Sequence, residues 1–210
     1  MAVDVWAVDW DSDDQESPLI VGGNEAFVAQ WPVNPDGDHL LHLFSINCYR
    51  LKELAGLENI PQSGFISVFS TYTQDYFLDN ICYSGDALEY ELITSGYTLV
   101  SFQEEESKCQ SPVAEFIPEK HPCLRKREVE EGSFPLFSFF ADSAANGLKG
   151  VEGLYNEYDF VCQFGSSSFP APYEDVFYLH EAVGYLFVKK GLVESPDKKL
   201  QSGLFFVQTA

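Results

Sequence analysis

Short apolar segments alternate with clusters of Gly, Pro and polar residues along the chain, and few stretches keep a helical period for more than two turns. This pattern predicts a mainly β protein of the α+β class, with antiparallel sheets and few short helices. Many of the apolar segments are rich in Phe, Tyr, Val and Ile, which suit a pleated, half-buried surface. The predicted strands are residues 3–8, 39–46, 64–72, 76–83, 88–93, 97–102, 158–164, 184–189 and 203–208.

Two segments have the pattern of a helix. Residues 49–57 place Leu51, Leu54 and Leu57 on one stripe, and Asn47 is available as the N-cap. Residues 141–155 have a weaker pattern, because each of three glycines in that stretch lowers helix propensity by up to about 1 kcal/mol relative to Ala.

The whole chain, residues 1–210, has the length of a single domain. Residues 104–131 combine a glutamate triplet, three prolines and a basic triplet, so we expect a loop-rich insertion there, between halves 1–103 and 132–210. A glycine enters an aromatic strand in each half, at Gly64 and at Gly184. This faint repeat is the basis for a hypothesis of two similar half-domains, with chance as the alternative.

The acidic residues are concentrated in the first half of the chain. Residues 1–107 hold nineteen Asp and Glu against Arg50 and Lys52, a net charge of −17, whereas residues 108–210 hold fourteen acids against ten bases, a net charge of −4. Such a field repels nucleic acid and anionic lipid and attracts a basic protein. The alternative is a solvated acidic surface that only keeps the protein soluble.

Signatures of catalysis are missing from the sequence. Neither GxGxxG nor GxxxxGK[ST] occurs, and the string from Gly165 to Phe169 lacks the second Gly of a serine-hydrolase elbow. We therefore expect a protein that is not an enzyme. No basic start precedes an apolar run, and no apolar run approaches the length of a membrane span, so neither a secretory signal nor a membrane role is expected.

The histidines and cysteines do not predict a metal site or a cofactor. His39 and His42 are three residues apart and would face opposite sides of a strand, and we expect His42 in or near the core. The cysteines lack CxxC spacing, which predicts reduced, mostly buried thiols in a cytoplasmic protein. They are Cys48, Cys82, Cys109, Cys123 and Cys162.

One stretch resembles a known family. The run Ile20-Val21-Gly22-Gly23 is followed by Trp31-Pro32, by Gly37, by the apolar run from Leu40 to Asn47, and by the run from Pro61 to Phe69. This order is similar to the opening of the YwqG-like family, and the segments 184–187 and 203–208 resemble its closing strands. The resemblance implies a β-rich fold of two similar halves without assigned activity. Some members of that family are immunity proteins, encoded beside secreted toxins that they neutralise.

The acidic field and this resemblance together suggest an immunity protein that binds a toxin delivered between bacteria, a basic protein of the nuclease class. The alternative is a non-enzymatic, β-rich binding module for a small ligand or a cellular protein. The expected contacts with the toxin are Trp10, Asp11, Asp13, Asp14, Glu16, Asp86, Glu89, Glu91, Glu104, Glu105 and Glu106. Tyr72, Tyr76 and Tyr90 are further candidate aromatic anchors.

Overall fold

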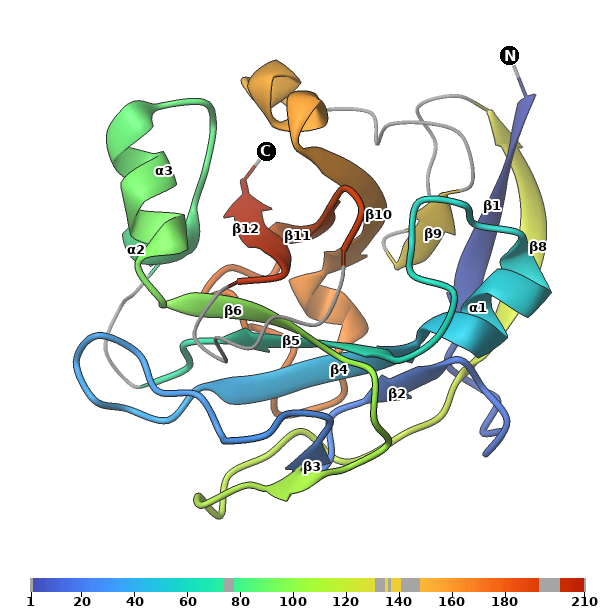
Figure 1. Cartoon of the computed structure of the whole chain (residues 1–210), viewed down its shortest axis with the longest axis horizontal. Helices are drawn as coiled ribbons and strands as arrows, with labels where there is room; N and C mark the ends of the chain where they lie inside the picture. Colours follow the sequence, from blue (N-terminus) through green and yellow to red (C-terminus); the bar gives the residue numbers. More distant parts are fainter. Residues whose placement is uncertain are drawn as a thin grey trace.

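The mainly β prediction is confirmed by the computed structural model, which describes residues 2–73, 78–130, 135, 137–140, 148–192 and 201–209 (Figure 1). The described strands are β1 (Ala2–Asp9), β2 (Leu19–Val21), β3 (Glu25–Ala26), β4 (Leu41–Asn47), β5 (Phe65–Ser70), β6 (Thr98–Gln103), β7 (Cys109–Gln110), β8 (Cys123–Glu130), β9 (Ser138–Phe140), β10 (Tyr158–Gly165), β11 (Val183–Lys189) and β12 (Gly203–Gln208). The described helices are α1 (Cys48–Ala55), α2 (Leu78–Ile81), α3 (Ala87–Thr94) and the 3₁₀-helices η1 (Glu152–Asn156) and η2 (Ser166–Ser168).

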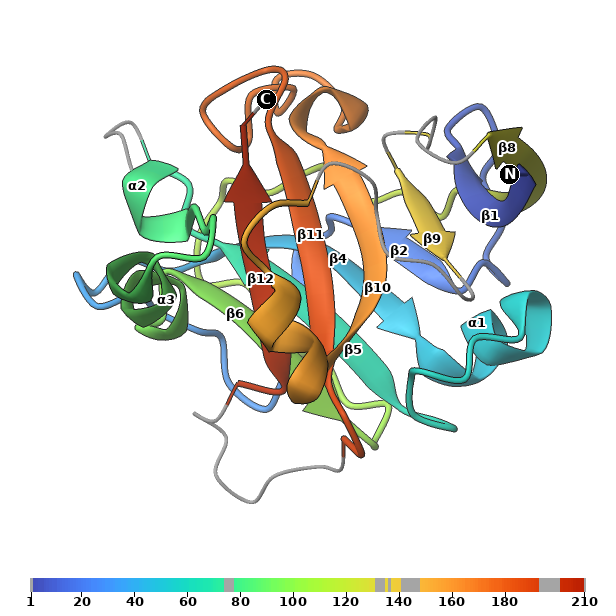
Figure 2. The same ribbon diagram turned by 90° about the horizontal axis from the view of Figure 1, so that it is seen from above.

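The strands form two main sheets, and every pairing between named strands is antiparallel. The larger sheet has the order β12-β11-β10-β9-β1-β8, and the smaller has the order β2-β4-β5-β6. A short third sheet pairs β3 with β7. Figures 1 and 2 show that the six-stranded sheet lies over the four-stranded sheet, with β12 beside β6.

Aromatic rings fill the space between the two main sheets. Phe44 of β4 and Phe164 of β10 pack edge to face with ring centroids 4.7 Å apart, and Phe164 stacks on Phe205 of β12 at 5.2 Å. All three side chains are fully buried. Because burial of each such ring contributes about 2–3 kcal/mol, these contacts hold the two sheets together.

The first predicted helix is confirmed as α1. The Asn47 Oδ1 accepts a hydrogen bond from the Arg50 backbone N–H at 3.0 Å, as expected for an N-cap, and Gly56 ends the helix in the left-handed region at φ 68°. Leu51 and Leu57 are buried, but Leu54 is 41% exposed, so the expected stripe of three leucines is only partly correct.

Two predicted strands are wrong. Residues 88–93 belong to α3, and within residues 76–83 the described part contains α2. The order of apolar and polar residues from Leu88 to Ile93 resembles a strand, but Asp86 caps the segment as a helix. Of the second predicted helix, residues 141–147 lie outside the described residues, and residues 152–156 form the 3₁₀-helix η1.

The loop predicted over residues 104–131 is wrong for residues 123–130, which form β8. This strand pairs with β1 along its whole length, from Ala2 opposite Glu130 to Asp9 opposite Cys123. Because β8 is an edge strand with exposed, charged side chains, it has no apolar alternation that the sequence could reveal. The six-stranded sheet therefore uses strands from both expected halves and from the segment between them. The similarity of two half-domains stays a prediction.

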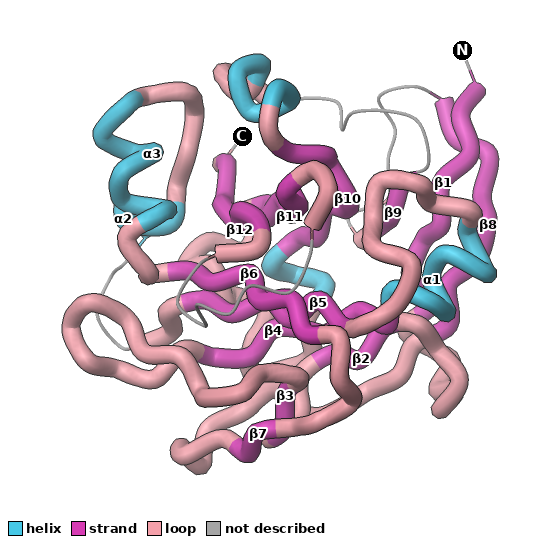
Figure 3. The backbone as a smooth tube through the Cα atoms, in the orientation of Figure 1, coloured by secondary structure: helices cyan, strands magenta, loops and turns pink. Residues whose placement is uncertain are grey.

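The three α-helices lie at opposite ends of the described structure, with α2 and α3 beside β12 at one end and α1 at the other (Figure 3). None of the helices in the described part of the chain has the length and apolar character needed to cross a membrane.

Candidate functional site

The structure separates the predicted contact residues into three groups. Asp86, Glu89 and Glu91 lie on α3, and residues 10–16 belong to the β1–β2 loop (residues 10–18) at the opposite end of the molecule (Figures 1 and 2). The glutamate triplet 104–106 follows the far end of β6, the strand that begins just after α3. The three groups therefore do not form one continuous patch.

The most prominent group is the α3 surface, which we define as Asp79, Asp86, Leu88, Glu89 and Glu91. Leu88 is 69% exposed, more than any other large hydrophobic side chain in the described residues. Asp79, Asp86 and Glu91 are exposed, and Glu89 is half-buried. The opposite side of the helix buries Ile93 against the core. The exposed Leu88 thus lies on a helix that also carries exposed Glu91, with exposed Asp86 at its N-cap.

Two of these carboxylates fix the start of the helix. Asp86 Oδ1 accepts hydrogen bonds from the Leu88 N–H at 2.8 Å and from the Glu89 N–H at 3.4 Å. Glu89 Oε2 accepts from the N–H and the hydroxyl of Ser84, at 2.7 and 2.9 Å. Within the described part of the chain, the carboxylates of Asp79 and Glu91 form no hydrogen bond or ion pair. They are available to a partner.

Backbone contacts hold the α2–α3 unit against β12. Cys82 bridges to Val207, and the Tyr83 N–H donates to the Val207 carbonyl oxygen at 3.2 Å. The loop before α3 also packs on a neighbouring loop so closely that a Cβ built on Gly150 would lie 1.8 Å from the Ser84 carbonyl oxygen. Two adjoining loops can approach this closely only through glycine. The α3 surface is therefore held in a fixed position.

The field of the α3 surface is unusually one-sided. Residues 53–107, which include α2 and α3, contain ten Asp and Glu and no Lys, Arg or His. Nearby Tyr158 adds no charge, because burial and a hydrogen bond with Tyr90 raise the pKa of its hydroxyl. A basic partner would therefore meet a mainly negative surface here, although exposed Lys149 lies beside the loop before α3.

The acids of the β1–β2 loop are bonded to the body of the protein. Glu16 forms an ion pair with Arg50 at 2.7 Å, and Asp13 Oδ1 accepts a hydrogen bond from the His121 N–H at 3.0 Å. Asp14 Oδ1 accepts from the Glu16 N–H at 2.9 Å, whereas Asp11 is exposed. Part of the negative charge of this loop is thus paired or hydrogen-bonded within the protein.

Trp10 is less accessible than a binding anchor requires. Its side chain is half-buried, and its ring packs edge to face on Phe137 with centroids 5.6 Å apart. Tyr72 and Tyr90 are also half-buried, each against another tyrosine, and Tyr76 lies outside the described residues. The exposure of Leu88 was not predicted, because Leu88 was assigned to the predicted strand 88–93.

Bases of β8 oppose the acids of β1. Arg125 lies 2.5 Å from Asp9, and Lys126 lies 2.6 Å from Asp4. The hydrogen bond from Arg125 lowers the pKa of Asp9. The β1–β2 loop follows β1 directly, so this end of the molecule presents a mixture of charges.

A buried polar chain lies inside the four-stranded sheet. His42 Nδ1 is 2.8 Å from the Gly22 carbonyl oxygen, which can only accept, so this nitrogen carries the proton. His42 Nε2 then accepts from the Ser45 hydroxyl at 2.9 Å, and Ser45 is 2.8 Å from the Ser67 hydroxyl. Burial lowers the pKa of His42 to about 4. The prediction of a core position for His42 is confirmed, and no substrate can reach this pair of Ser and His.

The cysteines are free in the structure, but fewer of them are buried than predicted. Cys48 and Cys162 are buried, whereas Cys82, Cys109 and Cys123 are half-buried. Burial raises the pKa of Cys48 to about 12 and that of Cys82 to about 11, so neither thiol is activated as a nucleophile. Among the described residues, no group of three or more His, Cys, Asp or Glu is placed to hold a metal ion.

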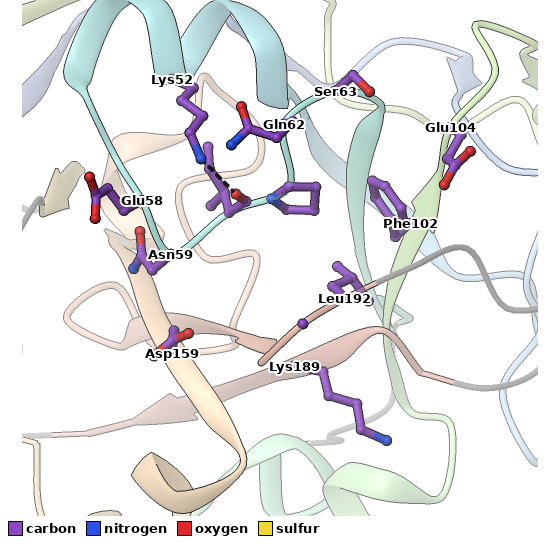
Figure 4. A pocket seen from close by; sticks show the side chains of 13 residues that line it. Lys52, Glu58, Asn59, Gln62, Ser63, Phe102, Glu104, Asp159, Lys189 and Leu192 are labelled. Carbon is purple, nitrogen blue, oxygen red and sulfur yellow. Dashed lines mark hydrogen bonds between the residues drawn. The ribbon is translucent and has the colours of Figure 1, made fainter.

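A pocket of about 460 Å³ lies where the ends of the two main sheets meet (Figure 4). Its wall is formed by α1, the α1–β5 loop and the ends of β6, β10 and β11. Lys52 and Gln62 point into it from one side, and Phe102 and Glu104 line the other side. Glu104 was predicted to contact a protein partner, and the structure places it at this pocket.

The chain was also compared with known proteins. No protein-family model matches it, and no curated protein matches it. The resemblance to the YwqG-like family stays a prediction.

Proposed function

We propose that this protein is an immunity protein that binds and neutralises a basic toxin of the nuclease class, delivered between bacteria. The observation that carries the proposal is the α3 surface, where the exposed Leu88 lies on the same helix as exposed carboxylates, in a segment of the sequence without bases. A nuclease holds nucleic acid in a basic groove, because phosphate contacts supply most of the affinity. Such a groove is complementary to the α3 surface in charge.

The arrangement of the α3 surface fits a protein-binding site. Binding energy in protein interfaces is concentrated in a few central residues that become fully desolvated, with polar groups around them. Exposed Leu88 would supply the apolar contact, and the exposed carboxylates of Glu91 and Asp79 would supply the polar contacts. These carboxylates would accelerate association, and burial of Leu88 would slow dissociation.

The same features argue against direct binding of nucleic acid or an anionic membrane. The net charge is −21, and the carboxylates of the α3 surface would repel phosphate groups. The free cysteines support a cytoplasmic site of action, since reduced thiols persist in that compartment. The role needs no catalytic residue and no cofactor.

Rescue of growth tests the proposal. Cells that produce the toxin encoded beside this protein should grow only when the protein is co-expressed. The double variant Asp79→Lys/Glu91→Lys should lose rescue and keep its unfolding temperature, because exposed charges contribute little to stability. The double variant Asp11→Lys/Asp14→Lys changes the net charge equally and should still rescue.

Two outcomes would contradict different parts of the proposal. If the α3 variant rescues as well as the unmodified protein, the binding surface is wrong. If the unmodified protein fails to rescue cells from any secreted toxin encoded beside it, the immunity function is wrong.

A further inference from the structure

The pocket at the ends of the two sheets has the size of a small-ligand site. Its volume of about 460 Å³ falls within the range of roughly 300–1,000 Å³ that is usual for such sites. Five separate elements form its wall, so its shape is set by the whole fold. It lies at the end of β6 away from α3, and the inference drawn from it does not rest on the proposed immunity function.

Lys52 supplies a positive group on one side of the pocket. Its Nζ donates to the Ile60 carbonyl oxygen at 3.4 Å and forms no ion pair within the described part of the chain. An ammonium group has three donors, so further donors remain for a ligand. The chain has 33 acidic residues against 12 Lys and Arg, which makes an unpaired lysine at a pocket wall notable. A carboxylate of a ligand is the group that it would bind best.

Carboxylates lie at several places around the pocket. Figure 4 shows Glu58 on the same side as Lys52, Asp159 set apart from Lys52 on β10, and Glu104 at the far side beside Phe102. Asp159 Oδ1 is 3.8 Å from Lys190 Nζ, near the outer limit of an ion pair, so this carboxylate keeps capacity for a second cation. An ammonium group of a ligand is the natural partner at this end.

The space between the charged groups is apolar. Phe102 and Ile60 present largely buried side chains to the pocket, and Leu192 is half-buried beside them.

We infer that this pocket binds a zwitterionic, peptide-like ligand, a dipeptide with apolar side chains. Its carboxylate would bind Lys52, its ammonium group would bind Asp159, and its side chains would contact Phe102, Ile60 and Leu192. A ligand with only negative charge would meet the pocket carboxylates, and one with only positive charge would leave Lys52 without a partner. A free amino acid carries its two charges on one carbon, whereas a dipeptide holds them further apart, as the separate positions of Lys52 and Asp159 require.

Calorimetric titration of the whole protein tests this inference. The probes are leucyl-phenylalanine, its N-acetyl form, its C-terminal amide and free phenylalanine. Leucyl-phenylalanine should bind, and each blocked form should bind about tenfold more weakly, the factor expected for loss of one charge-assisted hydrogen bond. Free phenylalanine should bind more weakly than the dipeptide.

Variants show whether the named residues make the contacts. Lys52→Met should weaken leucyl-phenylalanine about tenfold and leave the affinity for the C-terminal amide unchanged, since that form has no carboxylate to lose. Asp159→Asn should weaken leucyl-phenylalanine about tenfold and leave the affinity for the N-acetyl form unchanged, since that form has no ammonium group to lose. Lys149→Met is the matched control, because Lys149 is exposed and does not line the pocket, and it should bind as the unmodified protein does.

The inference is overturned if leucyl-phenylalanine does not bind, if the blocked forms bind as well as the dipeptide, or if Lys52→Met weakens all probes equally. This last pattern would mean that the substitution disturbs the fold rather than a contact. None of these results would affect rescue by the α3 surface, so the two proposals fail separately.

Discussion

The α3 surface and the β1–β2 loop each carry four carboxylates, but they hold them differently. In the β1–β2 loop, Glu16 pairs with Arg50, and the preceding strand pairs Asp9 with Arg125. The acids of the α3 surface form no ion pair within the described residues, and their hydrogen bonds go to the start of their own helix. The α3 surface therefore exposes more of its negative charge to solvent than the β1–β2 loop does.

This difference explains why the net charge of a sequence range is a poor guide to a surface. Residues 1–107 appear evenly acidic, but β8 brings Arg125 and Lys126 alongside β1 from more than a hundred residues away. No strand carries bases to α3 in the same way. A basic partner is therefore expected at α3 rather than at the β1–β2 loop.

The largest expected effect is the loss of folding stability in acid, through protonation of His42 in the unfolded chain. Burial lowers the pKa of His42 to about 4, against roughly 6.5 in an unfolded chain. Above pH 6.5 the ring is neutral in both states and adds no pH dependence. Below it, the unfolded chain binds a proton that the native state does not, so about 3 kcal/mol of stability is lost as the pH falls from 6.5 to 4.

Chemical denaturation across that pH range measures this loss. The variant His42→Gln cannot take up the proton, so its stability should fall by much less between pH 6.5 and pH 4. Equal slopes for both proteins would show that His42 is not the titrating group.

The second effect concerns the position of the α3 surface. Gly150→Ala would place a Cβ 1.8 Å from the Ser84 carbonyl oxygen at a residue with φ 70°. We expect a loss of about 2 kcal/mol in unfolding free energy, together with weaker partner binding as the loop before α3 is displaced. Gly153→Ala is the control, because nothing lies within 4 Å of its added Cβ. Similar stability for both variants would contradict the close packing of this loop.

The third effect distinguishes the two ends by their exposed leucines. Leu88→Ser on α3 should raise the dissociation rate of the toxin complex about tenfold, because a buried apolar contact is lost. Leu54→Ser on α1, near the β1–β2 loop, should leave that rate unchanged, although Leu54 is itself 41% exposed. Surface plasmon resonance with the immobilised toxin measures both rates. A faster dissociation for the α1 variant would move the interface to the other end.

The smallest effect is expected at the glutamate triplet. Reversal of Glu104, Glu105 and Glu106 to Lys should change unfolding free energy by less than about 0.5 kcal/mol. The loop is held through its backbone, where Gln103 Nε2 donates to the carbonyl oxygens of Glu105 and Ser107 at 2.8 and 2.7 Å. Association with the toxin should slow about twofold through the change in overall field. A larger slowing would add this loop to the interface.

Much of the fold could be predicted from the sequence, because most strands bury apolar residues in a recognisable pattern. The strands β4, β5, β11 and β12 are long apolar runs, and Asn47 marks the start of α1. The edge strand β8 could not be found in this way, since neither of its faces is mainly apolar. Its pairing with β1 depends on the three-dimensional arrangement of the sheet.

The candidate site was only partly predictable. Asp86, Glu89 and Glu91 were expected to contact a partner, but on a strand, where they would be spread along one line. The spacing of Asp86 and Glu89 resembles a capping box and was the available sign of a helix. The pocket was not predictable, because its lining comes from elements far apart in the chain.

The association rate measured against ionic strength tests the central claim most directly, for the unmodified protein, for Asp79→Lys/Glu91→Lys and for Asp11→Lys/Asp14→Lys. We predict that the rate of the unmodified protein falls steeply with salt, that the β1–β2 loop variant behaves nearly the same, and that the α3 variant associates slowly at every salt concentration with little salt dependence. An α3 variant that keeps the rate and salt dependence of the unmodified protein would contradict the claim.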